Sequence, residues 1–260
     1  MKLHRIYGII LRHFFNSIHN YDRIGDMFYW PAIDLILWGT TSVYFASKIN
    51  TPLVVLSIIS GVIFWMIIWR GQYEITVGLL EDIWAQNLVN IFVSPVLFIE
   101  WIVAVLTIGI LKMSIAVTFA SLLSFWLFKI NIFFFGFYLI IFALSLLMTG
   151  WAVGFLVAGL IIRNGTKIQT LAWTAIALLS PFSATSYPVS ILPLWAQNIA
   201  RAVPTSYIFE NMRRLIFQHQ INYSEIFISF GLNSIYLLLA LIFLQRSFKK
   251  AKQKGFINLY

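Results

Sequence analysis

The chain has 260 residues, of which 60% are hydrophobic and only 10% are charged. A soluble domain carries about 25% charged residues, and a single soluble core of this length could not bury so much apolar surface. Disorder is excluded as well, because disordered segments have low hydrophobicity. The composition therefore predicts an integral membrane protein. Its net charge of +9 fits basic cytoplasmic loops better than nucleic-acid binding.

Residues 1–27 are predicted to form an amphipathic helix. Apolar residues recur at steps of three and four on one face, at Leu3, Tyr7, Ile10, Phe14 and Ile18. Basic residues follow the same rhythm on another face, at Arg5, Arg12 and Arg23. We expect this helix to lie in the membrane interface, with its basic side toward lipid phosphates. A helix packed on a partner is the alternative.

Six stretches are apolar enough to cross a hydrocarbon core of roughly 30 Å. They cover residues 30–46, 53–69, 100–128, 132–162, 168–188 and 224–244. Lys and Arg gather near both chain ends and after the second and fourth stretches, which predicts that both termini are cytoplasmic. The predicted fold class is an all-α membrane protein with six transmembrane helices, in which residues 1–260 form a single transmembrane domain.

The segment 71–95, which follows the second predicted span, is acidic for a cytoplasmic loop. Its apolar residues make a helical stripe that includes Leu79, Leu80, Ile83 and Trp84, whereas Glu81 and Asp82 lie off this stripe. Pro95 ends the pattern. Acidic residues are poorly suited to anionic lipid, so the segment is interpreted as a helix that docks on a partner protein. An ordinary interfacial helix is the alternative.

The segment 188–215 is predicted to be a re-entrant element on the outer side. An apolar stretch about half a span long lies between Pro193 and Val203, and Pro193 suits the first turn of a helix. Such broken backbone is tolerated at membrane depth only where protein or a water-filled cavity covers it. A loop lying flat on the outer leaflet is the alternative.

Two charged residues lie inside predicted spans, Asp34 in the first and Lys112 in the third. Charged residues in spans face the bundle interior or a cavity. Three arrangements stay open: the two residues pair, they line a cavity, or Lys112 extends its side chain to the interface. Small residues at Gly150, Gly154 and Gly159 predict close helix packing in the fourth span.

Two loops carry ordered motifs. The outer loop has a Tyr-Pro pair, then Leu-Pro-x-Trp, Pro-Thr-x-Tyr and Glu-x-x-Arg. These motifs are formed by Tyr187, Pro188, Leu192, Pro193, Trp195, Pro204, Thr205, Tyr207, Glu210 and Arg213. The inner loop has an acidic residue, a Leu-rich helix, Ser-Pro and Glu, at Glu74, Leu79, Leu80, Ser94, Pro95 and Glu100. In both loops the chain resembles the permease subunits of type-2 ABC exporters, the ABC-2 family. It departs from the family wording at Ile75 and Thr76, where Arg is usual after the first Glu, and in the extra Glu81–Asp82 pair.

The resemblance implies a homo- or heterodimer of permeases that sits on two ATP-binding subunits in the cytoplasmic (inner) membrane. ATP and Mg would be held by those subunits, and no phosphate-binding loop motif occurs in this chain. The chain itself is therefore predicted to be no enzyme and to bind no cofactor, no metal and no nucleic acid. Its partners would be the ATP-binding subunits, the second permease and the lipid bilayer.

The resemblance also implies two sets of functional residues. The ATPase-coupling residues would be Glu74, Leu79, Leu80, Glu81, Asp82, Ile83, Trp84 and Asn87. The re-entrant gate residues would be Tyr187, Pro188, Pro193, Trp195, Pro204 and Tyr207. The expected substrate is amphipathic, lipid-like or drug-like, moved out of the cytoplasm or inner leaflet. A polysaccharide or lipid-linked glycan exporter is the alternative, and a secondary transporter is a more remote one.

Overall fold

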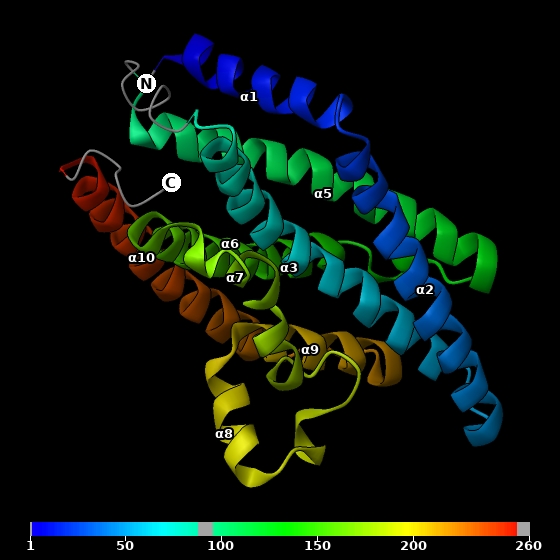
Figure 1. Ribbon diagram of the computed structural model, residues 1–260. Coiled ribbons are helices and arrows are strands. Elements are labelled where there is room, and N and C mark those ends of the chain that lie inside the picture. Colours follow the sequence, from blue (N-terminus) through cyan, green and yellow to red (C-terminus); the bar gives the residue numbers. More distant parts are fainter. Residues whose placement is uncertain (1, 88–95, 254–260) are drawn as a thin grey trace.

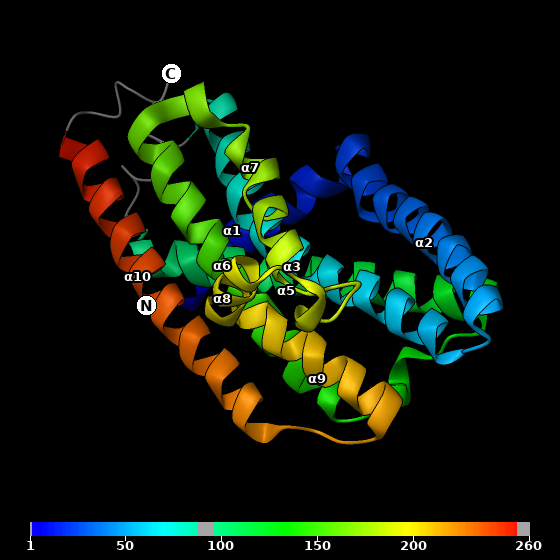
Figure 2. The ribbon, with the colours of Figure 1, turned by 90° about the horizontal axis from the view of Figure 1, so that it is seen from below.

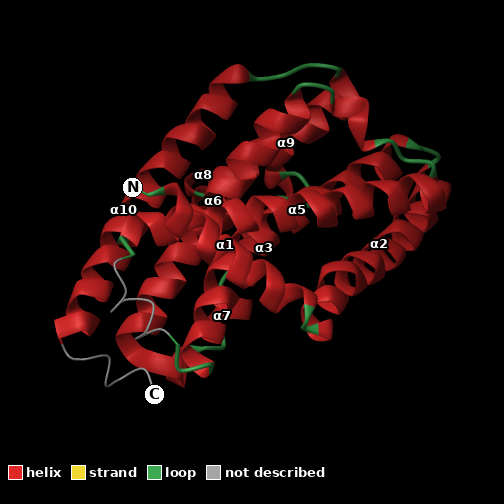
Figure 3. Ribbon diagram, turned by 90° about the horizontal axis from the view of Figure 1, so that it is seen from above, coloured by secondary structure: helices red, strands yellow, loops and turns green. Residues whose placement is uncertain are grey.

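The computed structural model describes residues 2–87 and 96–253. These residues form helices and turns, and no strand occurs among them. Long helices lie alongside one another in a bundle and are joined by short loops (Figures 1 and 3). The prediction of an all-α fold is therefore confirmed.

Six long helices make up most of the chain. They are α1 (Leu3–Ile18), α2 (Tyr21–Ile49), α3 (Leu53–Trp84), α5 (Phe98–Phe128), α6 (Tyr138–Asn164) and α10 (Tyr223–Gln253). Shorter elements connect them: η1 (Ile132–Phe135), η2 (Gly165–Ile168), α7 (Leu171–Thr174), η3 (Ala177–Phe182), η4 (Val189–Ile191), α8 (Leu194–Ala202) and α9 (Pro204–Gln218).

Four elements in the described part of the chain are long and apolar enough to cross a membrane, namely α3, α5, α6 with η2, and α10. The prediction of a membrane-embedded protein is thus supported, but two of the six predicted spans are not among the four. One of these is α2, which has 29 residues and is less apolar than the others. Three acidic residues, two basic residues, several hydroxyl groups and the polar atoms of Trp and Tyr lower its hydropathy.

The other is the predicted fifth span, residues 168–188, which is not a single helix. Short helical turns occupy this part of the chain, η2, α7 and η3, and bends follow them. Pro181 lies inside η3 and cannot donate a backbone hydrogen bond. The Thr and Ser residues nearby also favour turns over helix interiors.

The second predicted span and the first part of the segment 71–95 form one continuous helix, α3. A separate cytoplasmic helix within residues 71–84 is therefore wrong. The rest of that segment, from 88 to 95, lies outside the described residues, and Ser94 and Pro95 belong to it. At the start of the chain α1 ends at Ile18 and α2 begins at Tyr21, so the predicted helix 1–27 divides between two helices.

Close packing at glycines joins α6 to its neighbours, as the spacing of small residues predicts. A Cβ atom on Gly150 would lie 2.5 Å from the carbonyl oxygen of Ile68 in α3. A Cβ atom on Gly159 would lie 2.7 Å from the ring of Phe243 in α10. Only glycine allows the helices to approach this closely at these points. The prediction for α6 is confirmed.

Buried hydrogen bonds add to the contact between α6 and α10. Thr149 Oγ1 donates to Asn233 Oδ1 over 2.7 Å, and Asn233 Nδ2 donates to the Ser145 carbonyl oxygen over 2.9 Å. Polar side chains that satisfy one another across helices stabilise association in an apolar environment. They hold α10 in place although much of its surface faces outward.

Candidate functional site: a buried charge cluster between α1, α2, α3 and α5

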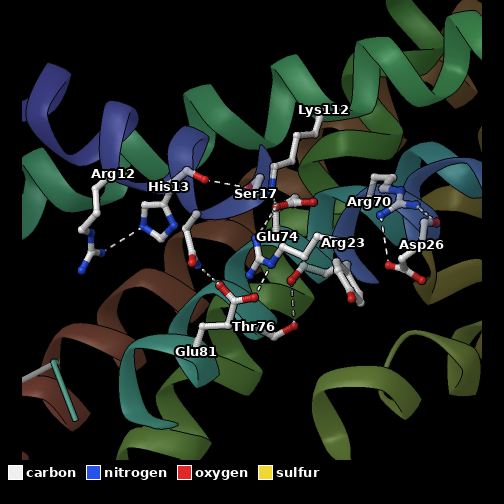
Figure 4. A network of polar contacts seen from close by, with 12 residues as sticks. Arg12, His13, Ser17, Arg23, Asp26, Arg70, Glu74, Thr76, Glu81 and Lys112 are labelled. Carbon is white, nitrogen blue, oxygen red and sulfur yellow. Dashed lines mark hydrogen bonds and ion pairs between the residues drawn. The ribbon is translucent and has the colours of Figure 1, made fainter. Parts of the chain in front are cut away.

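The start of α1, the end of α3 and the end of α10 lie at the same end of the bundle (Figure 1). Charged side chains concentrate near this end in spite of the low charge content of the chain. We use the name charge cluster for Arg12, Arg23, Glu74, Glu81, Asp82 and Lys112. Figure 4 shows most of this network, with side chains from α1, α2, α3 and α5 pointing toward one another.

Helical spacing explains the acidic side of the charge cluster. Glu74, Gly78 and Glu81 are separated by four and three residues, so they share one face of α3. Helices α1 and α2 supply one arginine each, Arg12 and Arg23, from sequence positions near the turn that connects them. Four helices that are remote in sequence thus meet around one charged face.

The most deeply buried pair joins α3 to α5. Lys112 Nζ lies 2.7 Å from Glu74 Oε2, and both residues are buried, with exposed fractions of 7% and 6%. Arg23 Nη1 lies 3.8 Å from the same carboxylate oxygen. Lys112 therefore pairs with Glu74, and of the three arrangements left open by the sequence, pairing with Asp34 is not the one observed. Asp34 is half-buried on α2 and has no hydrogen bond or ion pair within the described residues.

Two further contacts fix α1 and α2 to the end of α3. Arg12 and Asp82 pair in a bidentate manner, with Nη1–Oδ1 and Nη2–Oδ2 distances of 3.0 Å each. Asn16 Nδ2 donates to Glu81 Oε2 over 2.9 Å, and Arg23 Nε donates to the other oxygen of Glu81. Bidentate pairs of this kind fix orientation as well as distance. The interfacial prediction for α1 left its arginines free for lipid phosphates, whereas here Arg12 and Arg23 face acidic side chains of the same chain.

His13 lies beside the charge cluster and is uncharged. Its Nε2 accepts a hydrogen bond from Arg12 Nη2 over 3.2 Å, which requires the neutral ring. Burial, together with repulsion from Arg12, Arg23 and Lys112, lowers the pKa of His13 to about 3. Its Cε1 atom would lie 3.8 Å from a Cβ atom on Gly78, so the histidine packs directly on α3. The His13 ring is therefore a neutral group that packs between charged side chains.

More charged contacts surround this end of the bundle. Glu100 accepts hydrogen bonds from the backbone nitrogens of Leu97 and Lys2, over 3.0 and 2.7 Å, and so caps the first turn of α5. Arg70 Nη1 lies 3.5 Å from Asp26 Oδ2 and joins α3 to α2. A cavity of about 190 Å³ opens between α1 and the end of α3, and its polar lining includes members of the charge cluster.

The predicted coupling residues are mostly enclosed by the chain itself. Leu79, Leu80 and Ile83 are buried in an apolar core that also holds residues of α5 and α6. The apolar stripe at these positions therefore packs within the chain. Only the last turn is exposed. There Trp84 is 50% exposed and stacks on Trp173. Its ring N–H donates to the side-chain oxygen of Gln169. Asn87 borders the 190 Å³ cavity.

The predicted gate residues fall on two helices of different character. Helix α8 projects from one side of the bundle (Figures 1 and 2), and its Trp195 is largely exposed, with its ring edge against Phe182. Helix α9 is packed into the main apolar core. Pro204 opens α9 at its first position, as proline prefers. The segment 188–215 is therefore two helices, of which the second is the buried one.

Several of the gate residues hold the connecting backbone in place. The Tyr187 hydroxyl donates to the Pro181 carbonyl oxygen over 2.8 Å, and the Tyr207 hydroxyl donates to that of Arg201 over 2.7 Å. Pro188 and Pro193 flank η4 with extended backbone and so end one short helix and precede the next. The observed contacts of these gate residues thus stabilise the loop backbone.

Two acidic residues of this region were not singled out as site residues, and both bind basic side chains. Glu210 accepts from the backbone nitrogen of Val189 over 2.7 Å and lies 3.0 Å from Arg213 Nη2. Glu225 binds Arg214 through two hydrogen bonds of 2.9 and 3.0 Å. The Glu-x-x-Arg spacing indicates the first pair, because residues three apart are neighbours on a helix. The second pair joins two helices and has no local signal.

No protein-family model matches this chain, and no curated protein matches it. The charge cluster therefore has to be interpreted from its own geometry. Taken with the four apolar helices, it belongs to a membrane-type helical bundle whose first two helices are fastened to the end of α3 by partly buried ion pairs.

Proposed function

We propose that this chain is the membrane-spanning permease subunit of an ATP-driven exporter that moves an amphipathic, lipid-like or drug-like substrate. The observation that carries the proposal is the continuity of α3. This helix runs from its apolar first half to an exposed end at 84–87 without a break, and its last turns hold the charge cluster. The ordered motifs between 180 and 215 support the same function.

In this proposal, a separate ATP-binding subunit contacts the exposed end of α3. Glu81 and Asp82 bind side chains of α1 and α2, so a displacement of this end would carry three helices together. Glu81 and Asp82 therefore have an indirect role in coupling. They transmit motion within the chain, and Trp84 and Asn87 make the contact.

The remaining topology is part of the proposal. Helix α2 and the short helices between 165 and 182 would complete six crossings, and α8 with α9 would form the outer re-entrant element. Both termini would face the cytoplasm. Two permeases, identical or related, would pair in the inner membrane on two ATP-binding subunits that hold ATP and Mg.

Co-purification from the native membrane tests this function. We expect the tagged chain to bring down a stoichiometric ATP-binding subunit whose vanadate-sensitive turnover is retained in the complex. Isolation of the pure chain, with no nucleotide-binding partner, would overturn the proposal and favour a secondary transporter.

A pair of variants locates the contact. Ala85 is exposed next to Trp84, and Ser190 is exposed in η4, far along the chain. We expect Ala85→Asp to reduce recovery of the ATP-binding subunit, and Ser190→Asp to leave it unchanged, because only the first places a charge at the proposed contact. Equal recovery with both variants would argue against the end of α3 as the contact.

A further inference from the structure

Helix α2 carries a carboxylate halfway along its length that has no partner. Asp34 forms no hydrogen bond or ion pair within the described residues, whereas every other acidic side chain that the structure describes is in an ion pair. A charged side chain inside a helix that crosses a membrane is expensive and usually marks a functional position, and α2 is one of the crossings that we propose. A positively charged ligand would supply the partner that the described residues do not.

Aromatic rings flank Asp34 on its own face of the helix. Trp30 and Trp38 are four residues before and four residues after it, so each lies one turn away on the same side. Both rings are accessible, with exposed fractions of 56% and 41%. Aromatic faces attract organic cations, and Trp does so most strongly. A carboxylate between two Trp rings thus offers the two features that attract an amine or quaternary cation, a negative charge and aromatic faces.

The position of α2 leaves this face accessible. Figures 2 and 3 show α2 along one edge of the bundle, with α10 along the opposite edge. Leu35 is fully buried and Gly39 packs against Phe128 of α5, so a different face of α2 makes the inward contact. Asp34 itself is half-buried, so it lies beside the inward face of α2 and not on it.

We propose that Asp34, Trp30 and Trp38 bind the cationic group of an amphipathic organic cation. The apolar part of such a ligand would lie along the exposed Ile and Leu side chains of α2, in contact with lipid. That this ligand is transported cargo rests on the proposed export function, but the binding itself does not. The site would favour monovalent cations with a delocalised or alkylated charge over anions of the same size.

Binding of tetraphenylphosphonium to the purified full-length chain in lipid nanodiscs tests the proposal. Tetraphenylborate has nearly the same shape and the opposite charge, and empty nanodiscs report partition into lipid. We expect saturable binding of the phosphonium to the wild-type chain. Asp34→Asn should weaken it by about tenfold or more, while Asp34→Glu should keep most of it. Binding of the borate should not weaken in Asp34→Asn.

Matched aromatic variants test whether phosphonium binding depends on the two Trp residues next to Asp34 or on any exposed ring of α2. Trp30→Leu and Trp38→Leu should each weaken phosphonium binding several-fold, whereas Tyr44→Leu should not, because Tyr44 is exposed on another face of α2. Absence of saturable binding, or equal affinity in the wild type and in Asp34→Asn, would overturn the site. The assay contains no ATP-binding subunit, so its result is independent of the co-purification test.

A second copy of the chain is the competing occupant of this face. The chain has no cysteine, so Asp34→Cys introduces a single reactive position. Rapid disulfide formation between two copies through position 34 would show that the carboxylate belongs to a subunit contact and would overturn the proposal. Labelling of that cysteine by a methanethiosulfonate reagent, with no disulfide between copies, is the result expected for an accessible ligand site.

Discussion

At the scale of single residues, the charge cluster consists of charges that depend on one another. Lys112 and Glu74 are both buried, and each is the main compensation for the other. Breaking a buried pair by removing one partner leaves an unpaired charge and typically costs about 3–5 kcal/mol, whereas replacing both partners is often neutral. Comparison of single and double substitutions can therefore separate the stabilisation that the pair provides from the free-energy cost of burying its charges.

We expect Glu74→Gln to destabilise the chain by about 3–5 kcal/mol, because the Lys112 ammonium then stays buried without its carboxylate. Combining Glu74→Gln with Lys112→Met should restore most of the loss. Thermal unfolding of the detergent-solubilised chain measures both. Lys167→Met, at an exposed position, serves as the control. If the destabilisation of the double variant equalled the sum of those of Glu74→Gln and Lys112→Met, the pairing would be contradicted.

Acidification should weaken the packing of α1 through His13. The folded-state pKa of His13 is lowered to about 3, while the unfolded chain titrates near 6.5, so the unfolded state takes up a proton first as pH falls. The free energy of unfolding is therefore highest above pH 6.5 and falls progressively between pH 6.5 and pH 3. The loss is about 2 kcal/mol by pH 5. Unfolding measured at pH 7 and pH 5 checks this.

The histidine contribution can be isolated by substitution. His13→Gln retains an acceptor for Arg12 but does not titrate, so its stability should change little between pH 7 and pH 5. His4→Gln, at an exposed position on the same helix, should keep the pH dependence of the wild type. An unchanged pH dependence in His13→Gln would assign the acid effect to other groups.

At the scale of helices, the contacts that could be predicted are those with a local pattern. Gly150, Gly154 and Gly159 lie at helical spacing in an apolar stretch, and this suffices to indicate a close crossing. The pair formed by Glu74 and Lys112 has no such pattern, since 38 residues separate its members and Asp34 offered an equally plausible partner. Pairing between distant helices depends on how they pack.

The α3 stripe shows why amphipathic patterns can mislead in a membrane bundle. Leu79, Leu80 and Ile83 have the spacing of a helix with one apolar face, and Glu81 with Asp82 suggests that the other face meets solvent. In the structure the apolar face packs within the core and the acidic face packs on α1 and α2. Both faces are buried because basic helices cover the acidic side.

The crossing of α3 and α6 should be sensitive to one added methyl group. A Cβ atom on Gly150 would lie only 2.5 Å from backbone of α3, so Gly150→Ala forces the helices apart and should cost about 1–3 kcal/mol. Gly231→Ala in α10 meets no atom within 4 Å and should be neutral or slightly stabilising. The difference in unfolding temperature between the two variants is the measurement, and equal behaviour would contradict this crossing.

At the scale of the whole molecule, an even number of crossings places both chain ends on one side. The start of α1 and the end of α10 lie together in Figure 1. Helices α6 and α10 run in the same direction, because Thr149 bonds Asn233 and Gly159 lies against Phe243, so the chain between them returns across the bundle. This order agrees with six crossings and not with crossing by the four apolar helices alone. Basic residues near both ends predict that this side is cytoplasmic. The number of crossings differs between the alternatives only at α2 and at residues 165–182.

Single cysteines introduced into this cysteine-free chain can determine the sides. We expect Lys2→Cys and Lys252→Cys to react with a membrane-impermeant maleimide only in inverted vesicles. Lys129→Cys and Gln220→Cys, in exposed turns after α5 and α9, should react in intact cells. Ser47→Cys, near the end of α2, should react with the second group if α2 crosses the membrane. If Ser47→Cys instead reacts only in inverted vesicles, as expected for Lys2→Cys and Lys252→Cys, α2 does not cross the membrane.

The unbroken length of α3 has a mechanical consequence. A helix of 32 residues is about 48 Å long, well beyond the hydrocarbon thickness of roughly 30 Å. If α3 tilts as a rigid rod about its close crossing with α6 at Gly150, its two ends would move in opposite directions. A tilt of about 5° around its midpoint would move each end by about 2 Å. A displacement of Trp84 would then move Leu53 in the opposite direction.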